Sequence, residues 1–72
     1  MDAVLNPEAA AQAVYELHFS SLFHEGRGYA FACDADGRID LDTLSERARA
    51  CYFYARALVG QDFARPVVQR VR

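Results

Sequence analysis

The sequence predicts a single α+β domain over residues 1–72, with the order helix, antiparallel β-hairpin, long helix (α-β-β-α). Three patterns predict this fold: apolar residues at helical spacing over 42–59, strict alternation on both sides of a turn over 29–41, and a helix-start signal near residue 7. An extended tail over 61–72 follows, whose last residues form either a short third strand or a frayed terminus.

The stretch 42–59 is the best-defined predicted element. It contains neither Gly nor Pro, it is long enough for about five helical turns, and Gly60 follows it as a typical stop. Its apolar residues recur at steps of three and four and form one stripe: Leu44, Ala48, Cys51, Tyr52, Ala55, Leu58 and Val59. We expect this stripe to pack on the core and Phe53 to point away from it.

The stretch 29–41 reads as a β-hairpin. Large and small residues alternate over 29–33, and Ile39 and Leu41 alternate with polar neighbours after the turn. Between them lie residues typical of a tight turn, Asp34-Ala35-Asp36-Gly37, in which Gly37 would take the left-handed conformation. The pattern therefore predicts two paired strands closed by this turn.

The N-terminal part of the chain predicts a helix over about residues 7–22. Asn6 suits a helix cap, Pro7 suits the first helical position, and Glu8 favours the positive end of the helix dipole. The apolar residues after it cover a wide arc of a helical wheel, in which Tyr15 and Phe19 extend the stripe sideways. A helix with so wide an apolar arc needs packing contacts on more than one side.

Size and aromatic content together favour self-association. Four Tyr and five Phe are many for a chain of 72 residues, because each large ring buries about 150–250 Å² and a small domain has little interior. Small domains commonly add disulfides, a metal or a second subunit. We therefore expect a homodimer.

Net charge and cysteine content narrow the class of protein. The charge is −2 overall, with a balance of −7 over residues 1–46 and +5 over 47–72, which sum to −2. All eight basic residues are Arg. Only two cysteines are present, and neither a signal peptide nor an apolar run of about 20 residues is apparent. We expect a cytoplasmic protein with reduced thiols and no membrane contact.

Metal and cofactor motifs are weak. The turn Asp34–Ile39 resembles the middle of a calcium loop, but alignment on Gly37 puts Ala32 and Thr43 where that loop needs carboxylates. Zinc would need a set drawn from His18, His24, Cys33 and Cys51, which have none of the short spacings of structural sites. We predict no metal, no cofactor and no catalytic residue, and an enzyme is not expected.

The best candidate contact surface lies on the long helix. Arg49, Phe53 and Arg56 follow one another at i, i+4 and i+7 with Tyr52 beside them, and arginine with aromatic residues is typical of protein interfaces. The full candidate interface set is Arg49, Tyr52, Phe53, Arg56, Tyr15 and Phe19. A second, weaker set for binding an anion is Arg27, Arg65, Arg70 and Arg72.

Three function classes follow from these features. The leading hypothesis is a small module of bacterial type that acts by protein–protein interaction and self-association. The first alternative is an accessory nucleic-acid-binding protein that uses the Arg-rich second half, although an acidic chain without Lys disfavours it. The second alternative is a ligand-binding or catalytic site formed between subunits.

Overall fold

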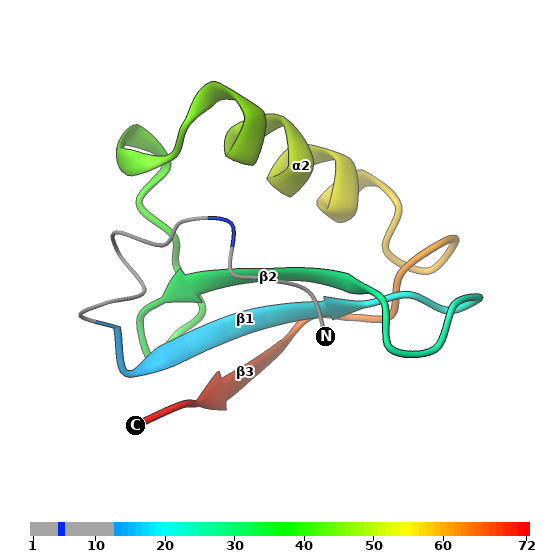
Figure 1. Cartoon of the computed structure of the whole chain (residues 1–72), viewed down its shortest axis with the longest axis horizontal. Coiled ribbons are helices and arrows are strands. Elements are labelled where there is room, and N and C mark those ends of the chain that lie inside the picture. Colours follow the sequence, from blue (N-terminus) through cyan, green and yellow to red (C-terminus); the bar gives the residue numbers. More distant parts are fainter. Residues whose placement is uncertain (1–4, 6–12) are drawn as a thin grey trace.

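A computed structural model of the chain describes residue 5 and residues 13–72. Its elements are the strands β1 (Tyr15–Ser20) and β2 (Gly28–Cys33), the 3-10 helix η1 (Leu41–Thr43), the α-helix α2 (Glu46–Ala57) and the strand β3 (Val67–Arg70). The strands form one antiparallel sheet in the order β2-β1-β3, and α2 lies beside β2 (Figure 1). The α+β class is therefore confirmed, but the predicted α-β-β-α order is not.

β1 is the central strand, in a region where the sequence predicts a helix. The predicted helix over 7–22 is wrong over residues 13–22, of which 15–20 form β1, and its start at 7–12 lies outside the described residues. Within β1 the apolar residues Tyr15, Leu17 and Phe19 alternate strictly with polar ones, so the period of two is present beside the helical spacing. Pairing on both sides with β2 and β3 selects the extended form.

β2 is confirmed over residues 28–33, but its predicted hairpin partner is wrong. β2 pairs with β1 over six residue pairs, and residues 38–40 form no strand. The turn after β2 forms as predicted: the Gly37 N–H donates to the Asp34 carbonyl over 3.0 Å, and Gly37 has φ +82°. Asp34 Oδ1 also accepts the N–H groups of Asp36 and Arg38, so this carboxylate holds the turn and the chain leaves it toward η1.

The predicted helix 42–59 divides into η1 and α2 because the chain carries two caps. Asp40 Oδ1 accepts the Asp42 N–H at the start of η1, and Ser45 Oγ accepts the Ala48 N–H at the start of α2. Between them Leu44 is extended, with φ −77° and ψ 141°. The α-helix thus begins at residue 46 and ends at 57, shortly before the left-handed Gly60.

β3 confirms the third strand at the C-terminal end of the chain. It pairs antiparallel with β1, with Tyr15 opposite Arg70 and His18 opposite Val67. Pro66 stands just before the strand, where its missing N–H costs no ladder hydrogen bond. β3 is an edge strand of the sheet (Figure 1).

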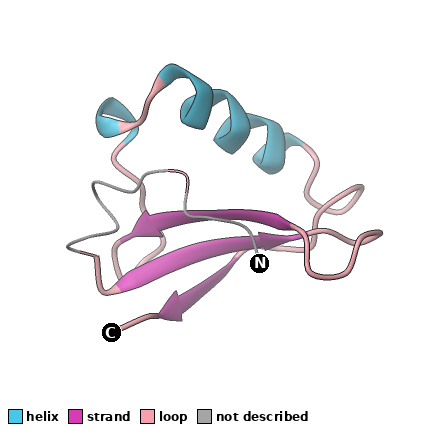
Figure 2. Ribbon diagram, in the orientation of Figure 1, coloured by secondary structure: helices cyan, strands magenta, loops and turns pink. Residues whose placement is uncertain are grey.

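The main core lies on the face of the sheet that carries the odd-numbered residues of β1. Phe19, Phe31, Ala55 and Phe63 are buried in one cluster with Leu17. Ala55 comes from α2, and Figure 2 shows this helix lying over one side of the strands. The turn at 34–37 covers the same face nearer β3, since a Cβ on Gly37 would lie 3.1 Å from Val68 Cγ2. The opposite face carries the even-numbered residues of β1 and is the more polar one.

Candidate interaction surface

Tyr52 connects the core to the surface of α2. Its ring makes edge contacts with Phe31 at 5.4 Å and Phe19 at 6.2 Å between centroids, which hold one side of it inside the domain. Its other side meets the Phe53 ring at 5.6 Å, and the Arg56 guanidinium carbon lies 5.5 Å from its centroid. The buried aromatic cluster thus continues outward to two residues of the candidate interface.

Phe53 lies on the outer flank of α2, as the sequence predicts. Its side chain remains 46% exposed. Arg49 and Arg56 flank it along the helix, and both guanidinium groups are held within the chain: Arg49 donates to the Leu41 carbonyl and Arg56 lies over Tyr52. We call Arg49, Tyr52, Phe53 and Arg56 the α2 flank. It is an aromatic surface with two positioned positive charges.

The remaining two candidate interface residues do not belong to the α2 flank. Phe19 is 1% exposed and is among the most buried side chains of the described residues, so it is core and offers no surface contact. Tyr15 is half-buried in β1 opposite Cys33. Both assignments depended on the predicted first helix, and the strand at this position removes their basis.

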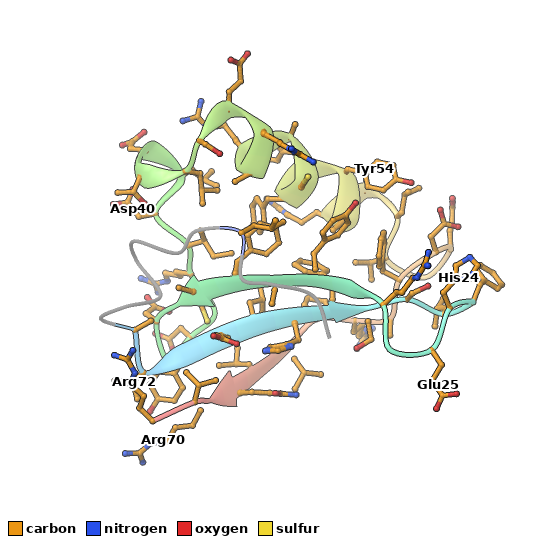
Figure 3. The ribbon with its side chains drawn as sticks, in the orientation of Figure 1. His24, Glu25, Asp40, Tyr54, Arg70 and Arg72 are labelled. Carbon is orange, nitrogen blue, oxygen red and sulfur yellow. The ribbon has the colours of Figure 1, made fainter. Side chains whose placement is uncertain are left out.

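The four arginines proposed for anion binding do not converge. Arg27 lies in the turn between β1 and β2, and Arg65 lies just before β3. Arg70 and Arg72 lie at the far end of β3, where Figure 3 shows them at the opposite end of the sheet from Glu25. Arg70 Nε donates to the Arg72 carbonyl, so this pair is tied locally. No single anion could contact all four.

An open groove of about 460 Å³ lies at the β1–β2 turn. Its lining includes polar side chains from β1, the β1–β2 turn, β2 and β3: His18, Ser20, Ser21, Glu25, Arg27, Tyr29 and Gln69. His24 and Glu25 mark the tip of this turn in Figure 3. The groove mixes charges of both signs and has the size of a small-ligand site, but its polar groups do not point to one ligand chemistry.

No nucleophilic triad is assembled in the described part of the chain. His18 Nε2 lies 3.0 Å from Glu16 Oε1, and no serine or cysteine hydrogen bond to this ring completes a triad there. The Ser21 hydroxyl accepts the N–H groups of Phe23 and His24 and so serves the turn. Burial, with Asp34 and Glu16 nearby, raises the pKa of the Cys33 thiol, which keeps it protonated and weakly nucleophilic at neutral pH.

The residues considered for metal binding are also apart. Over residue 5 and residues 13–72, no group of three or more His, Cys, Asp or Glu side chains is placed to hold an ion. Asp34, the main carboxylate of the calcium-like stretch, is occupied by two backbone N–H groups. Cys33 and Cys51 are unbonded thiols on β2 and α2.

A second exposed apolar surface was missed by the sequence reasoning. Val14, Val67 and Val71 are 38%, 55% and 42% exposed. They share the face that carries the even-numbered residues of β1, because Val67 lies opposite His18 and the Val71 N–H donates to the Val14 carbonyl over 2.8 Å. We call these three residues the valine patch. The available signal was the spacing of Val67 and Val71, which share a face if residues 67–71 are extended, but it identifies a face of the sheet only once β1 is known to be a strand.

Comparison with protein families, with curated proteins and with solved structures found no match to this chain. Over the described residues, no helix has the length and apolar character that crossing a bilayer requires.

Proposed function

We propose that this protein is a small interaction module, which acts by contact with other protein chains and without chemistry of its own. The observation that carries the proposal is the half-exposed Phe53 ring on the α2 flank. A large apolar ring on the surface of a small domain is costly to leave in water, and such surfaces commonly mark contact sites.

The construction of the α2 flank supports a role in binding. Aromatic and arginine side chains are the usual anchors of protein interfaces. Here Phe53 rests on Tyr52, whose ring is fixed by the core, and the Arg49 guanidinium is held by the Leu41 carbonyl. A surface that is ordered before binding loses less conformational entropy when a partner arrives. The flanking charges favour a partner with apolar and acidic side chains.

Binding to nucleic acid has less support. Arg49 and Arg56 lie on α2, whereas Arg27 and Arg70 lie at opposite ends of the sheet, so these arginines form no continuous row. Non-specific binding of nucleic acid needs a continuous basic track along the phosphate backbone. The net charge of −2 also opposes it.

A photo-crosslinking experiment tests the proposal. Phe53 is replaced by a benzophenone-bearing phenylalanine in the full chain, and the protein is illuminated in its native cells. We expect a covalent adduct with a defined second protein. Arg47, which is also exposed on α2 but lies on the other flank, is the matched control position. Identical adduct patterns at 53 and 47, or no adduct at 53, would overturn the proposal.

A further inference from the structure

We propose that two copies of this chain pair antiparallel through β3, so that their two three-stranded sheets become one continuous six-stranded sheet. The inference rests on the proposed function, since it names a second copy as one partner. It uses β3 and the valine patch, which are separate from the α2 flank.

The hydrogen-bond pattern of β3 shows which backbone groups face outward. The Val71 N–H donates to the Val14 carbonyl, so residue 71 points its backbone groups at β1. Because these directions alternate along an antiparallel strand, residues 67 and 69 also point inward, and Val68 and Arg70 point outward. Val68 and Arg70 therefore present the donors and acceptors of an open edge.

At the other edge of the sheet, formed by β2, the outward backbone groups alternate in the same way, and one of them is bonded to Leu5. The Ser21 N–H donates to the Arg27 carbonyl, which by alternation turns the Ala30 backbone outward from β2. The Leu5 N–H donates to that Ala30 carbonyl over 2.9 Å. Among the described residues, β3 is thus the edge to which no further strand is paired.

Sterics and charge select one register for a two-fold pair of β3 strands. The outward residues must face one another, which leaves Val68 opposite its own copy, Val68 opposite Arg70, or Arg70 opposite its own copy. Val68 opposite itself would set Arg70, inside β3, against Pro66, which has no N–H to donate; with Val68 opposite Arg70, Pro66 instead faces Arg72, beyond the end of the strand. Arg70 opposite itself would set two like charges face to face. The register that remains places Val68 opposite Arg70 and Gln69 opposite Gln69.

The selected register also covers the valine patch. With Gln69 on the two-fold axis, Val67 of one copy lies opposite Val71 of the other, twice, on the same face of the sheet. These side chains are 55% and 42% exposed in the single chain. Cross-strand pairs of β-branched residues stabilise a sheet, so the pairing satisfies the backbone edge and the exposed valines together.

Disulfide trapping tests the register. In a chain with Cys33→Ser and Cys51→Ala, single cysteines are introduced at positions 68, 69 and 70, and the folded proteins are oxidised mildly. Gln69→Cys should form a disulfide-linked dimer fastest, because residues 69 of the two copies form a close, non-hydrogen-bonded pair. Gln61→Cys, exposed in the chain between α2 and β3 and outside the pairing strand, is the control. Faster linkage at 68 or 70, or equal linkage at 61, would overturn the register.

A proline substitution tests the edge itself, by sedimentation of the otherwise native chain. Arg70→Pro removes the outward N–H and leaves the bonds to β1 in place, whereas Arg70→Ala keeps the N–H. We expect Arg70→Pro to raise the dimer Kd by about tenfold or more, since symmetry removes two hydrogen bonds at once. Arg70→Ala should leave the dimer Kd unchanged or lower it. A wild-type monomer at high micromolar concentration overturns the inference but not contact through Phe53. A dimer indifferent to Arg70→Pro overturns the edge pairing alone.

Discussion

Tyr52 is the residue that joins the buried core to the exposed α2 flank. Its ring touches Phe19 and Phe31 on one side and Phe53 on the other. Phe53 is therefore placed by the core without being part of it, and its removal should affect binding more than folding.

Replacing Phe53 by Ala should lower the free energy of unfolding by only about 1 kcal/mol, because the half-exposed ring loses little burial and one aromatic contact, that with Tyr52. Phe31→Ala is the comparison, because Phe31 is fully buried and its truncation should cost about 3–5 kcal/mol. Urea unfolding of both variants measures the difference. A loss at Phe53 as large as that at Phe31 would make Phe53 a core residue and remove the α2 flank as a contact site.

Gly37 has two separable reasons to be glycine, and a pair of substitutions distinguishes them. Gly37 and Gly26 have nearly equal φ values, +82° and +81°, but only a Cβ at Gly37 meets a neighbour, Val68. Both Gly→Ala changes should cost about 1 kcal/mol for the left-handed backbone, and Gly37→Ala should cost more. Thermal unfolding measures both. Equal losses of stability would show that the contact between a Cβ at position 37 and Val68 is relieved by a small shift and adds no cost.

At the scale of elements, the caps decide where the long apolar stripe becomes helical. Asp40 begins η1 and Ser45 begins α2, with the extended Leu44 between them. Leu44 is buried, as its place in the apolar stripe predicts, although it stands in the extended break between η1 and α2.

Ser45→Ala should destabilise the domain by about 1 kcal/mol, because the Ala48 N–H then loses its side-chain acceptor. Ser45→Asp restores an acceptor and should retain most of the stability. Unfolding in urea, followed by far-UV circular dichroism, measures both variants. If Ser45→Asp proves as damaging as Ser45→Ala, the side chain does not cap α2.

At the scale of the whole molecule, the sheet separates two kinds of surface. Its covered face is filled by α2 and the turn at 34–37, while its edge at β3 and the valine patch remain open. Arg70 and Arg72 stand at the end of this edge, and in the proposed two-fold pair the Arg70 side chains of the two copies lie diagonally across the axis, where their like charges repel.

Salt should therefore leave the dimer unchanged or strengthen it, since screening weakens the repulsion between arginines while apolar contacts persist. Sedimentation equilibrium across a range of sodium chloride concentrations measures the dimer Kd. Affinity for nucleic acid would instead fall steeply over the same range. A dimer that dissociates as salt rises would show that attraction between charges holds it together, contrary to the apolar valine patch.

The sequence was most informative where one local pattern had no competitor. The spacing over 42–59, the turn at Asp34–Gly37 and the alternation over 29–33 each led to an element close to its predicted place. Phe53 is exposed for the reason the helical wheel gives. The stretch 15–20 satisfied helical spacing and strand alternation together, and there the prediction failed.

By itself the sequence determined the α+β class, the helix with its exposed Phe53, and the left-handed turn, because caps, glycine and periodicity act within a few residues. Only the tertiary structure decided that Tyr15–Ser20 is the central strand, that β2 pairs with it, and that Phe19 is buried. The physical reason is that backbone hydrogen bonds of a strand are satisfied by partners distant in the sequence. Residues 28–33 and 67–70 supply those partners on both sides of β1, and no local preference of residues 15–20 records them.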